Sequence, residues 1–431
     1  MRFKLKIIYY YLKINLFHHF NSRAKLLKFQ DRKMKRFVKK TLRVSPFYNA
    51  HIENGVFDFN SIPEISKTEF MDEFDSMNTQ GIKLKDAMEV ALDAEKSRKF
   101  KSEINGITIG LSTGTSGKRG LFLVSENERA QWVSLVMSKI IKPKLFKKQK
   151  VAFFLRANSN LYSSVESNLF EFKYFDIFKP IAELLIELNN YQPTILAAQP
   201  SILIDIAEAQ KEKRISIQPI QILSFAEVLH NNDKEIISSI FKTKIKEIYQ
   251  CTEGLLGISC EYGTMHLNED FIRFDKEWID EDKFYPIVTD FTRHTQPVVK
   301  YKMNDVLQIK KEICPCGSIN LAIEKIIGRD DDVLLFNNIK VYPDLISRKI
   351  AIITNEFQKY TILQTGAFSL KIGLKCLPGE FENTSNKIKQ ILLELFSSLG
   401  IEQEIEFDFS TKIEHVNGNK ARKIKRIHYE N

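Results

Sequence analysis

The sequence has no apolar stretch near its start that is long enough to cross a membrane. The stretch from Ile7 to Leu12 ends at Lys13, whereas a spanning helix needs about 20 apolar residues. No small-residue cleavage site follows it, as a secretory signal peptide would require. We therefore expect a chain without a transmembrane segment or a signal peptide.

Cysteine is scarce and odd in number, with five residues among 431. This argues against a secreted scaffold held together by disulfides, in which cysteines are dense and paired. We therefore expect a protein of the reducing cytoplasm.

A strong excess of one charge is also missing from most of the chain. Lys and Arg number 64 against 54 Asp and Glu, and much of the surplus lies before Thr41 and after Asn417. A nucleic-acid-binding protein is not indicated, although a basic arm of this kind can contact nucleic acid or anionic lipid. Hydrophobic residues make up 43% of the chain, enough for one big domain plus a small one, or for two to three ordinary domains.

A Walker-type phosphate loop is absent, because Arg119 follows Gly117-Lys118 and the residue five before Gly117 is Ser112. Instead, the sequence LSTGTSGKRGLFL at 111–123 places Ser, Thr, Gly and Lys between two β-compatible runs. This predicts a hairpin loop rich in N–H and hydroxyl donors, which is suited to phosphate. An ordinary polar surface turn is the alternative.

The first 43 residues predict basic helices. Met34, Phe37, Val38 and Leu42 share one face of a helix, with Lys and Arg between them. We expect residues 1–43 to lie across the large domain with a solvated cationic face. Weak contact with a membrane surface is the alternative.

Further along the chain, apolar strands alternate with helices. Strands are predicted at 151–155 and 220–225, and helices at 126–141, 181–189 and 201–210. This alternation predicts an α/β fold with largely parallel sheets that bind ligands at the strand ends.

A second segment that suits chemistry is IYQCTEG, from Ile248 to Gly254. It places the hydroxyl of Thr252 beside the carboxylate of Glu253 at a turn. A Mg²⁺ ion bound to ATP phosphates needs hard oxygen ligands of this kind.

Five segments occur in an order and at a spacing that resemble the adenylate-forming (ANL) superfamily. They are the loop at 112–118, Ala226-Glu227, Tyr249 to Glu253, Val298 to Asp305, and Gly328 to Asp332. The resemblance is greatest to the phenylacetate–CoA ligase-like branch and, within it, to the uncharacterised relatives of the deazaflavin-coenzyme adenylylating enzymes. It runs from about Ser22 to the C-terminus.

The resemblance implies two domains behind the basic helices. A large multi-sheet α/β domain, 44–330, would bind ATP and the acid, and a small mobile α/β lid, 331–431, would follow. The alternating residues from Phe368 to Cys376 and the helical stripe from Ile388 to Leu399 match such a lid.

The resemblance also implies which residues bind ATP. The pyrophosphate end would be held by Ser112, Thr113, Gly114, Thr115, Ser116, Gly117 and Lys118. Ala226 and Glu227 would flank the adenine, with Tyr249 stacking beside it.

The remaining ligands implied by the resemblance follow in the chain. Thr252 would contact the α-phosphate, and Glu253 would hold Mg²⁺. Asp305 would accept hydrogen bonds from the ribose hydroxyls, since a carboxylate offers acceptors only. Arg329 would reach ribose or phosphate. Asp331 would lie at the hinge between the domains. The simpler alternatives are a turn residue for Asp305, a helix cap for Glu253 and a surface ion pair for Arg329.

Some positions depart from the family pattern. The proline that usually follows the loop lysine is absent, and Gln250 of the nucleotide-binding set replaces a common glycine. Met303-Asn304 and Asn337-Asn338 also replace residues that are common in the family. The adenylate-binding set is kept more faithfully than the rest, so activation of the acid is the better supported half-reaction.

The family carries a lysine in its C-terminal tail that reaches the α-phosphate and ester oxygens. In NGNKARKIKRI at 417–427, Lys423 aligns best and Lys420 is the alternative. Without the resemblance, either would be interpreted as a solvated charge.

Three thiols and one imidazole match a closed tetrahedral zinc site. They are Cys260, His266, Cys314 and Cys316. Buried cysteines and a core histidine are the alternative, but relatives in the resembled branch carry a structural zinc at equivalent residues. Such a zinc would tie the segment after Glu253 to the segment after Asp305, and would leave Cys251 and Cys376 without a metal role.

The predicted function is that of an ATP-dependent adenylate-forming ligase. It would convert a carboxylic acid and ATP to an acyl-adenylate (acyl-AMP) and pyrophosphate, then pass the acyl group to a thiol of CoA or an acyl carrier protein. We expect the acid pocket between Leu155 and Pro200, with Phe225 and the turn at 252–254. Aromatic residues there either suit an aromatic acid or are plain core, namely Phe170, Phe172, Tyr174 and Phe175.

Two other functions are compatible with the same residues. One is a nucleotidyltransferase that places AMP on a coenzyme-like acceptor hydroxyl. The other is a catalytically silent nucleotide-binding partner in a biosynthetic complex.

Overall fold

The protein is described by a computed structural model, whose chain divides into two compact units. The structure describes residues 3–53, 56–97, 102–111, 120–141, 148–155, 170–350, 353, 357–377, 379–413 and 424–427. Unit 1 comprises Met1–Met303 and Ile309–Glu324, and unit 2 comprises Asn304–Gln308 and Lys325–Asn431. The finer division at residues 43 and 330 stays a prediction.

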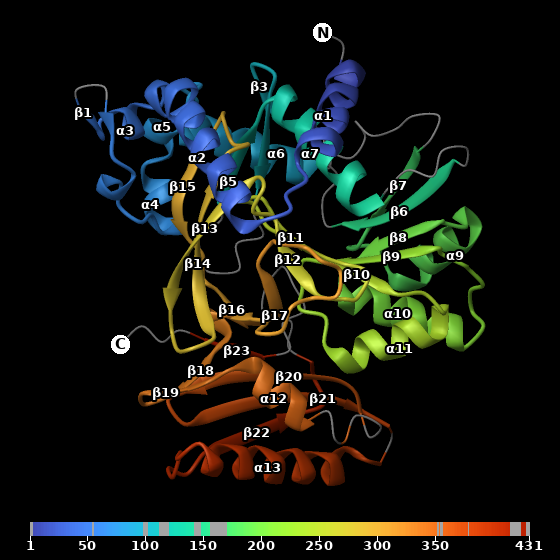
Figure 1. The fold of residues 1–431 in the computed structure, drawn as a ribbon. Helices are drawn as coiled ribbons and strands as arrows, with labels where there is room; N and C mark the ends of the chain where they lie inside the picture. The colour runs from blue at the N-terminus through green and yellow to red at the C-terminus, as the bar shows by residue number, and fades with distance from the viewer. Residues whose placement is uncertain are drawn as a thin grey trace. The chain divides into compact units, whose positions relative to one another are not determined.

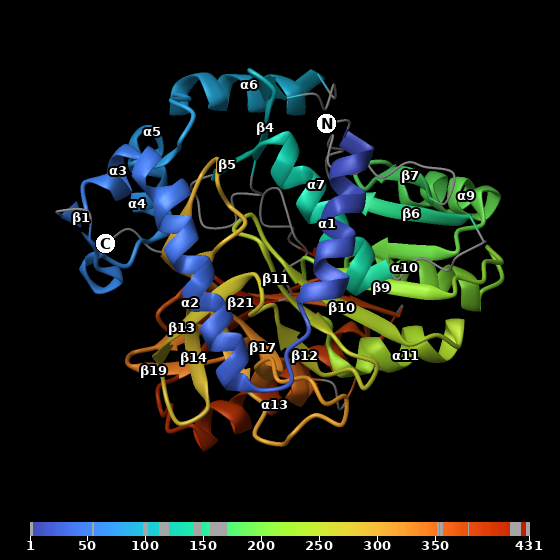
Figure 2. The same cartoon turned by 45° about the horizontal axis from the view of Figure 1, so that its top comes forward.

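Two helices begin unit 1, as the sequence predicts. They are α1 (Phe3–Phe17) and α2 (Arg23–Lys40), the latter capped by the hydroxyl of Ser22. α1 packs against α7 (Glu126–Val136), as Figure 2 shows. None of the described helices is both long and apolar enough to cross a membrane.

Unit 1 contains a parallel sheet with helices packed on it, at the right in Figure 1. Its strands, in spatial order, are β7 (Phe170–Asp176), β6 (Gln149–Leu155), β8 (Ile195–Ala198), β9 (Gln221–Phe225) and β10 (Ile245–Gln250). The helices are α9 (Ile181–Tyr191), α10 (Pro200–Lys211) and α11 (Asn231–Phe241). All three pack apolar side chains on one face of the sheet, which confirms the predicted alternation of strands and helices.

Antiparallel strands complete unit 1. β11 (Leu255–Ser259), β12 (Met265–Leu267) and the start of β17 (Ala322–Arg329) continue the sheet beyond β10. β13 (Ile272–Trp278), β14 (Lys283–Asp290) and β15 (Val298–Lys302) pair in that order.

A hairpin brackets the predicted phosphate loop. β4 (Ile107–Leu111) pairs antiparallel with β5 (Leu121–Val124) and with the short β3 (Glu103–Ile104), and α6 (Leu84–Ser97) covers them. The two strands predicted to flank the loop are therefore confirmed, while the loop residues Ser112 to Arg119 lie outside the described residues. The smaller elements of this region are α3 (Pro46–Asn49), α4 (Lys67–Asp72), α5 (Phe74–Met77), β1 (Ile52–Glu53) and β2 (Val56–Phe57).

The helix predicted at 126–141 changes type before it ends. Its α-helical part stops at Val136, and Met137–Ile141 form a π-helical turn. Two carbonyls of this turn accept hydrogen bonds from Lys246 Nζ, and one of them also accepts from Gln221 Nε2. Partners from the sheet thus satisfy carbonyls that the wider turn presents.

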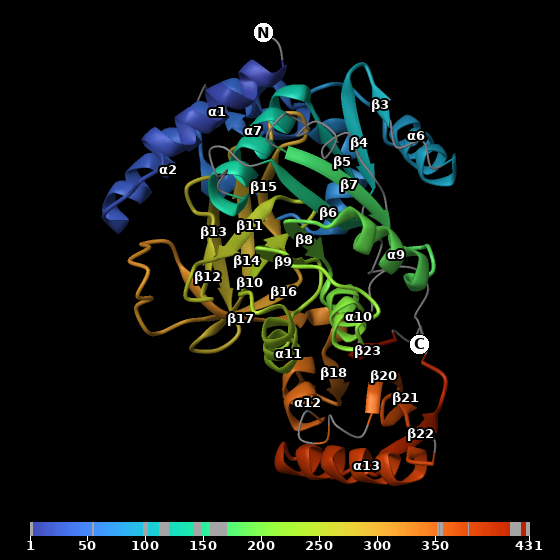
Figure 3. The same ribbon diagram turned by 90° about the vertical axis from the view of Figure 1, so that its right-hand side faces the viewer.

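Unit 2 is a small α/β layer, drawn mainly in orange and red in Figure 3. Its sheet runs β22 (Glu406–Ser410), β21 (Ser369–Cys376), β20 (Phe357–Gly366), β23 (Ile424–Arg426). The hairpin β18 (Leu334–Phe336)–β19 (Ile339–Val341), α12 (Pro343–Ile350) and α13 (Phe381–Ser398) pack on the same core, and β16 (Asp305–Ile309) begins in this unit.

Candidate nucleotide site and metal centre

Two predicted nucleotide-binding segments lie at one edge of the parallel sheet. Ala226-Glu227 follow β9, and Cys251 to Gly254 follow the neighbouring strand β10. Because parallel neighbours end at the same edge, these segments are adjacent there, where α/β sheets bind ligands. Fold topology thus brings together two segments that are 24 residues apart in sequence.

The turn after β9 has an unusual backbone. Ala226 has a φ of +70°, in the left-handed region that a non-glycine residue rarely adopts. The Glu227 carboxylate accepts hydrogen bonds of 3.2 Å from both the backbone N–H and the hydroxyl of Ser201. It therefore holds this turn against the N-terminus of α10, where a negative charge is favoured by the helix dipole. Contact of Ala226 and Glu227 with adenine stays a prediction.

A tight turn follows β10. Tyr249 is buried and pairs with Gly257 of β11, and the register shifts at Gln250. The N–H of Cys251 then donates to the carbonyl of Gly254 over 3.1 Å. The chain thus reverses across Thr252 and Glu253, as the sequence predicts.

The Thr252 hydroxyl donates to the Glu253 carboxylate over 2.9 Å. Burial raises the pKa of Glu253, but hydrogen bonds led by that from Cys251 outweigh it and hold the pKa below its ordinary value. The Glu253 carboxyl group is therefore ionised at neutral pH, and this is the form whose oxygens can bind magnesium.

A buried carboxyl group that the sequence does not reveal supports this turn. A Cβ built on Gly254 would lie 2.7 Å from Asp290 Oδ2. Asp290, at the end of β14, accepts hydrogen bonds of 2.7 Å from the N–H and the hydroxyl of Thr292. Burial raises the pKa of Asp290 to about 6 despite these bonds.

Asp305 and Arg329 lie together in unit 2. Arg329 Nε is 3.3 Å from Asp305 Oδ1, and Asp305 is buried. Arg329 therefore forms an ion pair, as its simpler alternative has it, but the partner is the buried carboxylate of Asp305. Their contact with ATP stays a prediction.

Other predicted site residues lie outside the described part of the chain. These are the phosphate-loop residues Ser112 to Lys118 and the two tail lysines, Lys420 and Lys423.

The strand and helix after the phosphate loop are held by buried polar groups. Gln296 Oε1 accepts the N–H of Leu123, over 3.0 Å. Glu128, in the first turn of α7, accepts the N–H groups of Ser125, His294 and Thr295. The Ser125-x-x-Glu128 capping box is a signal that the sequence offers for Glu128, whereas no local pattern marks Gln296 or Asp290.

The four predicted zinc ligands converge. Their donor atoms all lie within 4.8 Å of one another, and this set is a candidate metal group among the described residues. Cys260 follows β11, His266 lies in β12, and Cys314 and Cys316 occupy the turn before β17. Pairing of His266 with Ala322, between β12 and β17, brings the two halves of the set together.

The donor geometry fits a tetrahedral zinc ion. Cys260 Sγ is 3.6 Å from Cys314 Sγ, and Cys316 Sγ is 3.3 Å from His266 Nε2. A tetrahedral ion with Zn–S bonds of about 2.3 Å holds its sulfurs about 3.8 Å apart. His266 Nδ1 donates to the carbonyl of Asn320 over 3.1 Å, which leaves Nε2 for a metal.

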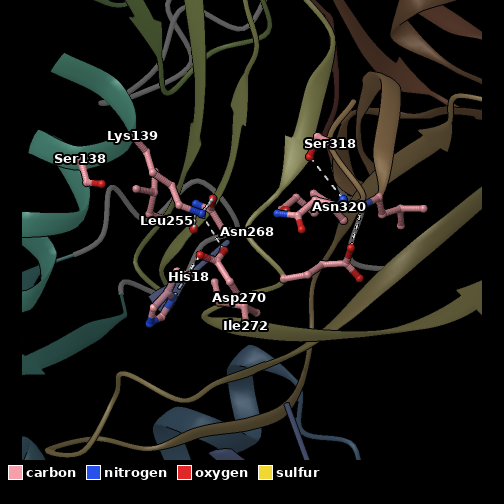
Figure 4. A network of polar contacts seen from close by, with 12 residues as sticks. His18, Ser138, Lys139, Leu255, Asn268, Asp270, Ile272, Ser318 and Asn320 are labelled. Atoms are coloured by element: carbon pink, nitrogen blue, oxygen red, sulfur yellow. Dashed lines mark hydrogen bonds and ion pairs between the residues drawn. The ribbon is translucent and has the colours of Figure 1, made fainter. Parts of the chain in front are cut away.

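A buried ionic network attaches the N-terminal helices to the rest of unit 1 (Figure 4). His18 Nδ1 donates to Asp270, and Lys139 Nζ donates to the same carboxylate over 2.6 Å and to Asn268 over 3.3 Å. Burial raises the pKa of Asp270, but Lys139 and His18 outweigh it and lower the pKa overall. Asp270 is therefore a stable anion between α1 and the π-helical turn.

The neighbouring Glu269 makes a second attachment. Its carboxylate forms a two-pronged pair with the Arg23 guanidinium and accepts the N–H of Leu321 over 2.6 Å. The Gln30 amide donates to the Glu269 carbonyl over 2.6 Å. Glu269 thus connects α2 to the start of β17, next to Asn320 of the metal centre.

Of the aromatic residues expected near the acid pocket, two belong to the core. The rings of Phe154 and Phe175 stack with centroids 4.6 Å apart, and Phe170 is also fully buried. Phe172 and Tyr174 are only partly buried. The core interpretation is therefore confirmed for Phe170 and Phe175.

Two relatives in sequence and one solved structure serve for comparison. No family model matches the sequence. The chain is 22% identical to "Protein CapK" of Staphylococcus aureus over 96% of this chain and 91% of that protein. It is 23% identical to the phenylacetate–coenzyme A ligase of Thermus thermophilus over 41% of this chain and 43% of that enzyme. It also superposes on a 2-hydroxyisobutyryl-CoA ligase solved with 2-HIB-AMP, with a TM-score of 0.67, 15% identity and coverage of 94% and 90% of the two chains.

The chain therefore has the fold of the adenylate-forming ligases, which confirms the predicted fold class. In sequence the chain resembles a phenylacetate–coenzyme A ligase, which agrees with the predicted resemblance to the phenylacetate–CoA ligase-like branch. The narrower likeness to relatives of deazaflavin-coenzyme enzymes stays a prediction.

Proposed function

We propose that the chain is an ATP-dependent acid–thiol ligase. It joins a carboxylic acid to ATP to form an acyl-adenylate and pyrophosphate, and then transfers the acyl group to a thiol. The observation that carries this proposal is the likeness of fold along 94% of the chain to a ligase solved with an acyl-AMP conjugate. The turn bearing Thr252 and Glu253 lies at the sheet edge where such a fold binds its ligand.

The described residues suggest how the first half-reaction is assisted. Ionised Glu253 would hold Mg²⁺, which would offset the negative charge of the ATP phosphates, and Thr252 would donate to the α-phosphate. Asp305 accepts the ribose hydroxyls, and Arg329 reaches the ribose or a phosphate. Lys423, or Lys420 in its place, stabilises the charge that develops at the α-phosphate as the carboxylate attacks.

The thiol belongs to CoA or to the phosphopantetheine of a carrier protein, and the reaction takes place in the cytoplasm. Zinc bound by Cys260, His266, Cys314 and Cys316 is structural, because four protein ligands leave the ion no open position. It joins the end of β11 to the start of β17.

Acid-dependent ATP–pyrophosphate exchange tests the first half-reaction. The purified chain is screened with alkyl and aryl acids, and exchange with at least one acid is expected. Glu253→Gln should lower the exchange rate about a hundredfold and raise the Mg²⁺ concentration needed for half-maximal rate. Glu235→Gln, on the exposed side of α11, is the matched control and should leave both unchanged.

The acceptor decides between the ligase and its alternatives. Consumption of the adenylate on adding CoA or a carrier protein supports the ligase. AMP transferred to a hydroxyl acceptor without any acid would establish the nucleotidyltransferase instead. A chain that binds ATP but shows no pyrophosphate exchange with any acid would be the catalytically silent partner. Its ATP binding should then be unaltered in the Lys420→Ala/Lys423→Ala double variant.

A further inference from the structure

Helix α1 is apolar on two opposite faces, and α7 covers one of them. On the covered face, Ile14 is buried and the carbonyl of Ile7 accepts the hydroxyl of Ser134 over 2.9 Å. The Tyr10 hydroxyl accepts the amide of Asn127 over 2.7 Å. This face has the role predicted for a helix that lies across the large domain.

The opposite face is exposed. It carries Leu5, Ile8, Tyr9, Leu12 and Leu16, each between 52% and 67% exposed. These positions, spaced i, i+3, i+4, i+7 and i+11, form one continuous stripe along the helix. We call them the α1 stripe. Single exposed leucines are ordinary, but an aligned apolar row is typical of a contact surface.

The helix that carries this stripe and the helix after it are both basic. α1 contains Lys4, Lys6 and Lys13 and no acidic residue. α2, which follows after a short turn, carries nine Lys or Arg residues and a single acid, Asp31. Its exposed basic residues are Arg23, Lys25, Lys28, Arg32, Lys35, Arg36, Lys39 and Lys40. Figures 2 and 3 show both helices at the surface of unit 1.

We propose that the α1 stripe docks on the surface of a bilayer that contains anionic lipid. A membrane interface offers an apolar layer beneath anionic headgroups, so it complements both the stripe and the adjoining lysines. α1 has 15 residues and a length of about 22 Å, less than the ~30 Å hydrocarbon core. It therefore lies in the interface, parallel to the surface.

The attachment of α1 suits this role. The buried pair of His18 with Asp270 and the packing of α1 against α7 hold the helix on the rest of unit 1. Docking of the α1 stripe thus holds unit 1 at the membrane while the other face of α1 stays packed on the protein. A second copy of the chain would cover the stripe equally well, but it would bring a second set of lysines to the same place.

Vesicle flotation of the full chain tests the proposal. We expect binding to phosphatidylcholine vesicles containing about a third phosphatidylglycerol, and little binding to phosphatidylcholine alone. Leu12→Glu/Leu16→Glu should lower the partition coefficient at least about a hundredfold, roughly tenfold for each leucine. Lys35→Gln/Lys39→Gln should weaken binding and flatten its dependence on salt.

Ile186→Glu is the matched control. Ile186 is 65% exposed on α9, remote from α1 in sequence, and its change should leave flotation unchanged. Equal binding to neutral and anionic vesicles, or equal binding by wild type and Leu12→Glu/Leu16→Glu, would overturn the proposal. So would a dimer, seen by sedimentation, that this double variant dissociates. The double variant should retain pyrophosphate exchange, so the outcome is independent of the proposed ligase reaction.

Discussion

Gly254 and Asp290 lie so close together that no side chain fits between them. The carboxyl oxygen Oδ2 of Asp290 is 2.7 Å from the point where a Cβ of residue 254 would lie. The turn that carries Thr252 and Glu253 therefore packs against the end of β14. A residue larger than glycine at position 254 would collide with the Asp290 carboxyl group.

Gly254→Ala should displace this turn. A methyl group at 254 must push away either the Asp290 carboxyl or the turn itself, and an error of about 1 Å at a reacting group can lower a rate by a hundredfold. We expect pyrophosphate exchange to fall about a hundredfold.

Gly400→Ala serves as the control for Gly254→Ala. Gly400 has a φ of +81° but no heavy atom within 4 Å of its Cβ position. Its replacement should cost about 1 kcal/mol of stability from backbone strain, with exchange close to wild type. Equal rates of pyrophosphate exchange in Gly254→Ala and wild type would contradict the claim that the contact with Asp290 positions the turn.

Asp290→Asn should alter the dependence of stability on pH. The pKa of Asp290 is raised from 3.8 to about 6 in the folded state, so the folded state binds its proton more readily than the unfolded state. Stability from this group is therefore present below about pH 4 and is lost as the pH rises through 6. The asparagine variant, which cannot ionise, should be more stable than wild type at pH 8, by up to about 3 kcal/mol.

Urea unfolding of both proteins at several pH values measures this difference. The gain should shrink as the pH falls from 8 and vanish near 4. A difference that is constant across the range would show that ionisation of Asp290 has no part in it.

Loss of a zinc ligand should destabilise unit 1. Metal analysis of the purified chain should find close to one zinc ion per chain. Cys316→Ser should remove it and lower the Tm by about 5 °C or more, because metal that binds only the folded state adds to stability. A chelator should have the same effect on wild type.

Cys376→Ser is the matched control for the metal centre. Cys376 lies in β21 of unit 2 and is not part of the ligand set, so zinc content and Tm should stay unchanged. A zinc-free protein with the wild-type Tm would refute the structural role.

Glu128→Gln should destabilise the region after the phosphate loop. The carboxylate of Glu128 accepts from donors on Ser125, His294 and Thr295, and an amide group would turn N–H donors toward some of them. We expect a loss of about 2–3 kcal/mol in urea unfolding, because buried donors lose their acceptor. Glu126→Gln, which removes only a surface pair with Lys6, should cost less than about 0.5 kcal/mol.

Much of the fold could be predicted from the sequence because it depends on local spacing. Apolar runs such as 151–155 and the helical period of residues 388–399 identify strands and helices without knowledge of their partners. Element ends were less certain, since they depend on partners. The π-helical turn after Val136, for example, presents carbonyls to Lys246 and Gln221, which come from distant strands.

The sequence by itself determined the types of the main elements and the candidate residues, Glu253 and the three Cys and one His among them, because residue type and spacing carry that information. The predicted meeting of the three Cys and the His is confirmed by the tertiary structure, which alone decided that Asp305 pairs with Arg329. The tertiary structure alone also revealed Asp290 beneath Gly254 and the exposed face of α1. The physical reason is that burial and contact arise when residues far apart in the chain pack together, and no local pattern records which atoms will be neighbours.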